Sequence, residues 1–340
     1  AAPCDLHGGI VFDRYFEHKP DTEVEVVIPE NATVDDVSEI LGDAGVIEYP
    51  SLFRLYAKLK KESGVDKDGK SVFIPGTYTI TPMENYMQLL DAFKEQYVRG
   101  TVWVTFPEGA TVEDIIETLT ENGISDRASL IRAINEYDYG LDFVNDIDMS
   151  NGRYYRLEGY LFPDTYEFFV NEDPSHAICR LLDNFSQRMD DELMTQVEES
   201  GYSLEEILII ASLIEKETDG KDRTNIASVI YNRLNNVGET YHKLEIDAAV
   251  IYGLGYANGE NYAGPLTQAD LDKDTPYNLR MHEGLPPTPI CNPGLASIRA
   301  ALEPADTNYY FYALGKEGVH HFFKTYREHV NFVNSSQYGG

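Results

Sequence analysis

One stretch of the sequence occurs twice, and this duplication constrains the fold more than any other feature. Val27-Ile-Pro-Glu-Asn-Ala-Thr-Val-Asp-Asp-Val37 returns as Thr105-Phe-Pro-Glu-Gly-Ala-Thr-Val-Glu-Asp-Ile115, at an offset of 107 − 29, or 78 residues. In each copy a β-rich run leads into Pro-Glu, and Thr33 or Thr111 stands at a helix N-cap before acidic residues. Apolar residues then follow at helical spacing. Each copy is therefore predicted to form a small unit of a strand and a capped helix.

The sequence changes character after the turn signal Asn151-Gly152, where longer helical patterns begin. Asp173-Pro174 opens an amphipathic helix, and Ser203-Leu-Glu-Glu206 is a capping box that opens the next. A third helical pattern runs over residues 222–235. We therefore expect an α+β fold, with small βα modules over 25–148 and a helix-centred mixed domain over 149–340.

Charge and hydropathy restrict the partners of this 340-residue chain. With 27 basic and 58 acidic residues, its formal net charge is −31. We expect no nucleic-acid partner, because a polyanion would be repelled by this field. No apolar run is long enough to span a bilayer. The chain begins Ala-Ala-Pro-Cys rather than with methionine, so we expect that a signal or anchor segment has been removed upstream.

Motifs for metals and cofactors are missing from the sequence. The three cysteines are far apart and form neither a zinc knuckle nor a disulfide framework: Cys4, Cys179 and Cys291. Three histidines near the C-terminus lack metal-site spacing: His320, His321 and His329. Lys216 could form a Schiff base, but no glycine-rich phosphate loop accompanies it. We expect no metal and no cofactor.

Glu215 is the candidate catalytic residue, because it continues an apolar face of a predicted buried helix. At about 100° per residue, Leu208, Ala211 and Glu215 lie on one face, and residues 207–214 are apolar nearly all round. Partial desolvation would raise the pKa of this carboxyl group toward the range useful to a general acid. The alternative is a structural carboxylate at the helix end that pairs with Arg223 or another cation.

A second cluster is the aromatic segment Leu157-Glu-Gly-Tyr-Leu-Phe-Pro-Asp-Thr-Tyr166. Tyr160 and Phe162 alternate as on a strand, and Asp164 follows the proline. Aromatic faces beside a carboxyl group suit the C–H faces and hydroxyls of a sugar ring. The alternative is a half-buried strand that ends in a Pro-Asp turn.

Five motifs in order resemble the YceG-like family of endolytic murein transglycosylases: 157–166, Ala211-Ser-Leu-Ile-Glu-Lys-Glu-Thr218, Ala227-Ser-Val-Ile-Tyr-Asn-Arg-Leu234, 284–294 and His320-His-Phe-Phe-Lys-Thr325. The resemblance covers residues 25–333. It implies a LysM-like region over 25–148, a catalytic domain over 149–340, and a membrane-proximal stub over 1–24 behind a removed single-pass anchor. It also implies work on peptidoglycan on the extracytoplasmic side of a bacterial membrane, with cell-wall synthases as candidate partners.

The resemblance also implies roles for single residues. The first glutamate of the family's Glu-Lys-Glu-Thr motif, its catalytic acid/base, falls on Glu215. Ten residues are implied as the substrate-binding groove: Glu158, Tyr160, Asp164, Tyr231, Asn232, Asp247, Tyr252, Tyr277, Asn278 and His320.

The expected reaction is lytic cleavage of the β-1,4 bond between N-acetylmuramic acid and N-acetylglucosamine inside glycan strands. Glu215 would act first as acid and then as base, leaving a 1,6-anhydro end. A muramidase-type hydrolase is an alternative, with Asp247 or Asp164 as its second carboxyl group. Two further alternatives are a non-catalytic peptidoglycan-binding scaffold and a pyridoxal-phosphate lyase that acts through Lys216.

Overall fold

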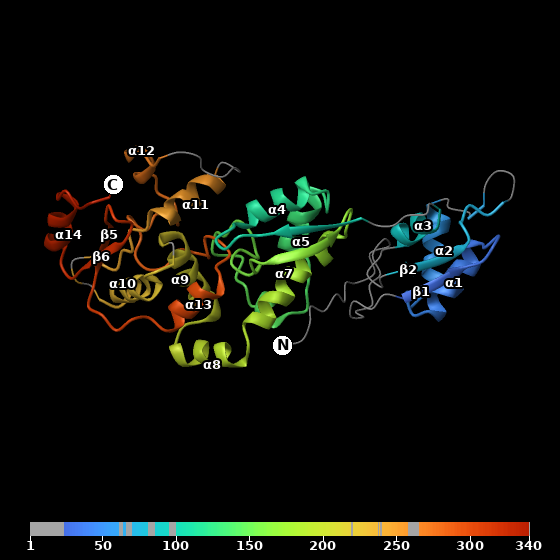
Figure 1. The fold of residues 1–340 in the computed structure, drawn as a ribbon, viewed down its shortest axis with the longest axis horizontal. Helices are drawn as coiled ribbons and strands as arrows, with labels where there is room; N and C mark the ends of the chain where they lie inside the picture. The colour runs from blue at the N-terminus through green and yellow to red at the C-terminus, as the bar shows by residue number, and fades with distance from the viewer. Residues whose placement is uncertain are drawn as a thin grey trace.

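The computed structural model describes residues 24–60, 64–65, 70–80, 86–94, 100–218, 220–236, 238, 240–257 and 265–339. Helices predominate, and the strands form two-stranded antiparallel sheets (Figure 1). This agrees with the expected α+β class, whereas the LysM-like nature of the N-terminal modules stays a prediction. Among the helices of these residues, none combines the length and the apolar character that crossing a membrane requires.

The first copy of the duplication lies in a unit with these elements: β1 (Val24–Ile28), α1 (Val34–Asp43), α2 (Pro50–Leu59), β2 (Gly76–Ile80) and α3 (Tyr86–Lys94). β1 pairs antiparallel with β2. Thr33 begins α1 as predicted: its hydroxyl accepts the Asp36 amide at 3.3 Å, and the Asp36 carboxylate accepts the Thr33 amide at 2.7 Å. The unit buries a hydrophobic core of its own.

The second copy lies in a unit of matching order: β3 (Thr101–Thr105), α4 (Val112–Glu121), α5 (Arg127–Glu136), α6 (Asp142–Asn145) and β4 (Thr165–Phe169). β3 pairs antiparallel with β4, and Thr111 caps α4 through Asp114 as Thr33 caps α1. Both units therefore contain a strand, two helices and a second strand paired with the first, and the second unit adds the short helix α6 before β4. Because β4 lies beyond residue 149, this sheet joins the two expected domains, whose boundary stays a prediction.

The prediction of a strand through Tyr160 and Phe162 was wrong. Residues 156–160 form turns, and the strand begins only at Thr165. Gly159 explains the turn, because its φ is +93° and a Cβ there would lie 2.5 Å from the side chain of Pro289. The backbone therefore bends here, where the later loop packs against it.

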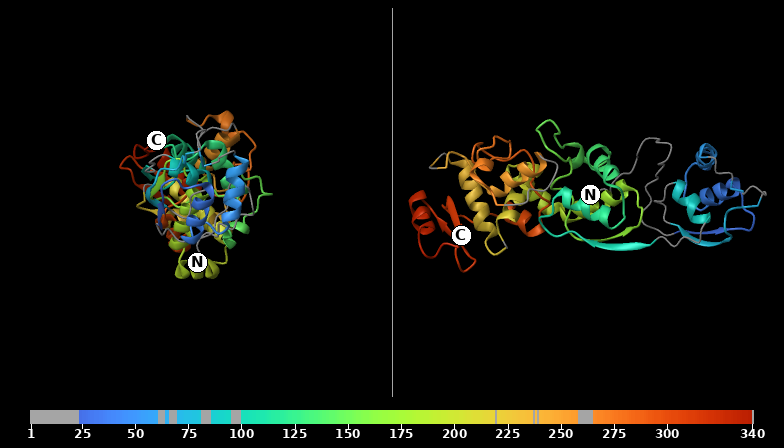
Figure 2. Two further views of the ribbon diagram at one scale, coloured as in Figure 1. Left: turned by 90° about the vertical axis from the view of Figure 1, so that its right-hand side faces the viewer. Right: turned by 90° about the horizontal axis from the view of Figure 1, so that it is seen from above.

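The remaining elements form the helix-centred half: α7 (Pro174–Arg188), α8 (Asp191–Ser200), α9 (Leu204–Glu217), α10 (Arg223–Asn235), α11 (Asp247–Ala257), α12 (Gln268–Leu271), α13 (Leu295–Leu302), β5 (Phe311–Leu314), β6 (His320–Phe323) and α14 (Tyr326–Val333). The helices predicted to open at Pro174 and after Ser203 are confirmed as α7 and α9, and the third pattern as α10. α9 is central and packs against α8, α10, α11 and α13 (Figure 1). The β5–β6 hairpin, with α14 packed on it, lies at one end of the molecule, near the C-terminus (Figure 2).

Most of the buried apolar side chains of the described residues belong to two clusters. One cluster spans residues 26–93, and the other spans residues 104–301. The second cluster contains the second copy of the duplication together with the central helices. Only the first copy therefore has a separate core, and it lies at one end of the molecule (Figure 1).

Asn292 fastens the second copy of the duplication to the helix-centred half. Its side-chain oxygen accepts the amides of Gly159 at 3.0 Å and Leu161 at 2.9 Å, and its side-chain nitrogen donates to the Ala110 carbonyl at 3.0 Å. Its backbone adds hydrogen bonds with Gly109 and Ala110. Asn292 is 1% exposed. This buried amide therefore fixes the loop after β3 against two segments that are distant in sequence.

Candidate active site

Glu215 lies in the last turn of α9, and its side chain is 8% exposed. Its Oε2 accepts the amide of Gly294 at 3.1 Å, and its Oε1 lies 3.5 Å from Nη2 of Arg223. Gly294 is the N-cap of α13, so the amide belongs to the positive end of that helix. Both contacts complement a negative charge on the carboxylate. The expected position on a buried helix is therefore observed, and so is the pairing with Arg223 that the alternative required.

Arg223 is itself held in place by neighbouring groups. Its Nε donates to the hydroxyl of Ser297 at 3.0 Å, and its Nη1 donates to the Gly220 carbonyl at 3.2 Å. Nη2 also lies 3.9 Å from Oε2 of Glu108. The guanidinium group therefore connects α10, α13 and the loop after β3 around Glu215.

Two glycines let backbone and side chains approach closely at this site. A Cβ at Gly109 would lie 3.5 Å from Cγ of Glu215, and the φ of Gly109 is +82°. A Cβ at Gly294 would lie only 2.0 Å from Oε1 of Glu108, which is too close for any side chain. In the first copy of the duplication, Asn31 takes the place of Gly109 with a φ of 59°. The same tight turn therefore serves both copies, but only the second reaches Glu215.

A second polar group lies at the same end of α9. The Tyr312 hydroxyl on β5 donates to Oε2 of Glu217 at 2.7 Å, and the ring of Tyr312 packs edge-on against His320 at 5.5 Å. Nδ1 of His320 lies 2.7 Å from Oδ2 of Asp222, and the other oxygen of Asp222 accepts the Thr218 hydroxyl. Burial raises the pKa of Glu217 above its ordinary range, with a further rise from Asp247 opposed by the Tyr312 hydrogen bond.

The raised pKa of Glu217 predicts how the stability of the protein depends on pH. The native state holds this proton above pH 4.5, the ordinary pKa, where the unfolded chain has lost it. The wild type should therefore lose stability as pH rises from about 4.5 through the native pKa. Glu217→Gln has no titrating group at this position, so it does not lose this stabilisation. Its free energy of unfolding relative to that of the wild type should therefore increase with pH. Urea unfolding at several pH values measures the difference, and a difference that does not change with pH would contradict it.

Glu158 and Tyr252, two of the expected groove residues, are buried together. Glu158 is 0% exposed and accepts the Val112 amide at 3.1 Å and the Tyr252 hydroxyl at 3.1 Å. Asn292 donates to it at 3.4 Å. A carboxylate at the N-terminus of α4 is favoured by the helix dipole. The structure thus gives Glu158 an internal role in joining α4 and α11.

The two expected groove residues of the aromatic segment differ in environment. Tyr160 is 2% exposed and packs between Phe143 and Phe185, with ring centroids 6.0 and 5.5 Å away. Burial raises its pKa. The Asp164 carboxylate lies nearer the surface and accepts hydrogen bonds from Arg188 at 2.9 Å and Asn184 at 3.1 Å. Tyr160 therefore belongs to the core, and Asp164 to an ion pair with α7.

Three further expected residues contact main chain or cations on other elements. Tyr231 donates to the Ala301 carbonyl at 2.7 Å, and Asn232 donates to the carbonyls at 307 and 309, at 3.0 and 2.9 Å. The Tyr231 bond holds α13, and the two Asn232 bonds hold the segment that leads into β5. The Asp247 carboxylate pairs with Arg280 at 2.7 Å.

Tyr277 and Asn278 are both buried, at 0% exposed. The Tyr277 hydroxyl bonds to that of Thr288 at 2.9 Å, and Asn278 donates to the carbonyls of Leu271 and Lys273 at 2.8 Å each. Two of the ten expected groove residues are linked by hydrogen bonds to the surroundings of Glu215: His320 through Asp222, and Glu158 through Asn292 and the Gly109 loop. Glycan contact by all ten stays a prediction.

Sequence reasoning missed several residues of this site. Glu108 stands in the duplicated Pro-Glu pair, and Gly294 ends one of the family motifs, but nothing local in the sequence places either beside Glu215. Tyr312 follows the alternation of a strand, which does not reveal its partner on α9. Among the described residues, no three His, Cys, Asp or Glu side chains are grouped to hold a metal ion.

Comparison with known proteins shows what this chain is similar to. The YceG-like family matches residues 26–335. A Bacillus subtilis (strain 168) protein named endolytic murein transglycosylase is 29% identical over 321 residues, 91% of this chain and 83% of that protein. A Streptococcus pneumoniae (strain D39) protein of the same name is 29% identical over 334 residues. The match covers 90% of this chain but only 57% of that longer relative.

A solved structure also resembles the fold described above. The crystal structure of a yceG-like protein from Listeria monocytogenes superposes with a TM-score of 0.58 at 28% sequence identity. The match covers 92% of this chain and 99% of the other. The similarity therefore extends over both copies of the duplication and the helix-centred half.

Proposed function

Because the chain belongs to the YceG-like family, we propose that it is an endolytic transglycosylase that cleaves peptidoglycan glycan strands with Glu215 as its acid and base. Two relatives that match about nine-tenths of the chain carry the name endolytic murein transglycosylase. The observation that carries the residue assignment is the environment of Glu215: a carboxyl group 8% exposed, held between Gly294 and Arg223. The proposal places the enzyme on the extracytoplasmic side of the membrane, behind an N-terminal anchor, with cell-wall synthases as partners.

The proposed reaction needs one carboxyl group for two proton transfers. Glu215 gives its proton to the glycosidic oxygen between N-acetylmuramic acid and N-acetylglucosamine, and the bond from that oxygen to C1 breaks. The C6 hydroxyl oxygen of the muramoyl unit bonds to C1, and its proton passes to the Glu215 carboxylate. No water is consumed, and the group returns to its starting state. Arg223 and the Gly294 amide hold the carboxylate in place between the two steps.

Analysis of the products tests the reaction type. We expect digestion of purified peptidoglycan to release muropeptides with 1,6-anhydro ends, each lighter by one water than the reducing end that a hydrolase makes. Mass spectrometry of the strand ends separates the two. Fragments from within strands, rather than only terminal disaccharides, would show endolytic cleavage. Products that carry only reducing ends would overturn the transglycosylase proposal in favour of a hydrolase.

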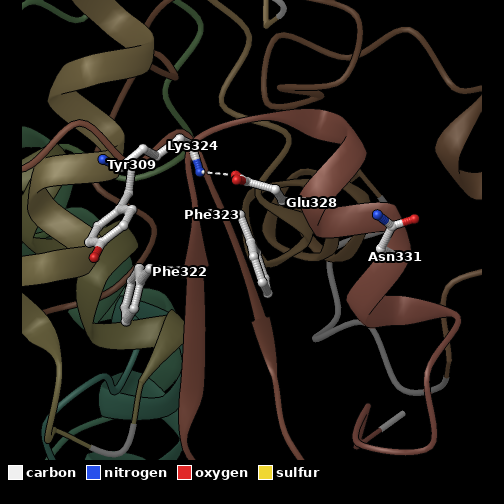
Figure 3. A pocket seen from close by; sticks show the side chains of 6 residues that line it. All are labelled: Tyr309, Phe322, Phe323, Lys324, Glu328 and Asn331. Atoms are coloured by element: carbon white, nitrogen blue, oxygen red, sulfur yellow. Dashed lines mark hydrogen bonds between the residues drawn. The ribbon is translucent and has the colours of Figure 1, made fainter.

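A pocket beside the hairpin supports binding of a sugar chain. It has a volume of about 390 Å³, within the range of small-molecule sites, and these residues line it: Tyr309, Phe322, Phe323, Lys324, Glu328 and Asn331. Tyr309 and Phe322 lie on one side, and Glu328 and Asn331 of α14 on the other (Figure 3). The Phe322 ring also lies 6.4 Å from His320, the residue bonded to Asp222. Aromatic faces with a polar rim suit the binding of a pyranose ring.

Tyr309→Ala should weaken glycan binding at this pocket, because it removes one aromatic wall. We expect about a tenfold loss of affinity for a hexamer of N-acetylglucosamine, equivalent to about 1.4 kcal/mol. The measurement is calorimetric titration in the Glu215→Gln background, where the oligomer is not turned over. Tyr241→Ala is the matched control, because Tyr241 is 64% exposed and does not line the pocket. If the two variants bound the oligomer with equal affinity, the pocket would not be part of the glycan-binding surface.

A further inference from the structure

Glu108 brings a second carboxylate to the surroundings of Glu215. It lies in the loop between β3 and α4, and its Oε2 is 3.9 Å from Nη2 of Arg223. The same nitrogen lies 3.5 Å from Oε1 of Glu215. One guanidinium nitrogen thus faces both carboxylates.

The position of Glu108 depends on a specific feature of the fold. Its carboxyl group lies so close to Gly294 that a Cβ there would be 2.0 Å from Oε1 and 2.1 Å from Cδ. The amide of that same glycine donates to Glu215. One backbone position therefore holds Glu215 through a hydrogen bond and accommodates Glu108 through the absence of a side chain.

The two carboxyl groups differ in their access to solvent. The Glu215 side chain is 8% exposed, whereas that of Glu108 is 51% exposed. The two alternative second carboxyl groups, Asp164 and Asp247, are instead closely paired with arginines, at 2.9 and 2.7 Å. Of the two carboxyl groups that face Arg223, that of Glu108 is therefore the more open to solvent.

We propose that Glu108 is a second catalytic residue, which contacts the muramoyl ring and stabilises the positive charge that develops on it. This inference rests on the proposed function. As the bond from C1 to the leaving oxygen breaks, C1 and the ring oxygen share a positive charge, which a preorganised carboxylate stabilises. Glu108 forms no bond and transfers no proton. Glu215 makes both proton transfers, and the C6 oxygen closes onto C1.

Glu108→Gln tests this role, because it keeps the size of the side chain and removes the charge. We expect kcat on glycan strands to fall about 10²–10³-fold, the usual cost of losing one electrostatic contact to a transition state. KM should change less than about threefold, because the positive charge that the Glu108 carboxylate stabilises develops only in the transition state and is absent from the bound substrate. The duplication supplies the control: Glu30→Gln removes the equivalent exposed carboxylate from the first copy and should leave kcat unchanged.

Glu108→Asp separates the charge from packing. It keeps a carboxylate in a shorter side chain, so it should recover at least about tenfold of the kcat lost in Glu108→Gln, with the same anhydro products. A kcat for Glu108→Gln within about threefold of the wild type would overturn the inference. The inference would also be overturned if Glu108→Asp had the wild-type melting temperature but a kcat no higher than that of Glu108→Gln. A different measurement tests the proposed function itself. If that function were wrong, Glu215→Gln would keep its activity on glycan strands.

Discussion

Glu215→Gln should abolish cleavage while leaving the fold intact. The amide keeps the shape of the side chain and can still accept the Gly294 amide, but it cannot give or take the proton. Loss of a general acid alone costs roughly 10²–10⁴-fold, and here one group serves as both acid and base. We therefore expect at least about a 10³-fold fall in the release of soluble muropeptides from purified peptidoglycan.

Two controls make this result specific. Glu198→Gln changes an exposed carboxylate on α8 and should leave turnover unchanged. The melting temperature of Glu215→Gln should stay close to that of the wild type. Near-normal turnover in Glu215→Gln would reject the assignment, and a non-catalytic wall-binding protein would then be favoured if isolated sacculi were still bound.

Asn292→Ala should cause a large loss of stability. The substitution removes the side chain that accepts the amides of Gly159 and Leu161 and donates to Ala110, all in a buried environment. Each buried group left without a partner costs about 1–3 kcal/mol. We expect the free energy of unfolding to fall by about 3 kcal/mol, measured by urea denaturation with an unchanged slope.

The matched control for this substitution is an exposed asparagine. Asn334→Ala removes a single side-chain hydrogen bond at the C-terminal end of α14 and should cost less than about 1 kcal/mol. If Asn292→Ala were equally mild, the second copy of the duplication would be attached to the helices by packing alone. The loop that carries Gly109 would then need another explanation for its position.

Local sequence chemistry predicted the elements well, because the signals lie within a few residues of one another. The threonine caps at Thr33 and Thr111 and the capping box at Ser203 all begin helices in the structure. The apolar stripe that ends at Glu215 correctly indicated a buried helix. The prediction of a strand through Tyr160 was wrong. The alternation there reflects core packing around the turn at Gly159, where the backbone lies against Pro289, far along the chain.

The candidate site was harder to predict, because its residues meet through tertiary contacts. Glu215 could be singled out from its own helix. Its pairing with Arg223 was also expected from the sequence, as the alternative interpretation of Glu215. Gly294 and Glu108 come from two other segments, and no spacing rule connects them to Glu215. The family resemblance transferred residues such as Tyr277 and Asn278 to a groove, yet the structure gives both internal hydrogen-bond partners. A family resemblance can indicate which positions are important, but it does not show which groups each side chain contacts.

The two duplicated units differ in how they pack, and this difference affects how such a chain can change over evolution. The first unit, with its independent core, could be exchanged or multiplied without disturbing the chemistry. The second is more constrained, since it shares its core with the central helices and its turn carries Gly109 and Glu108 to the end of α9. Substitutions should therefore accumulate more readily in the first unit than in the second.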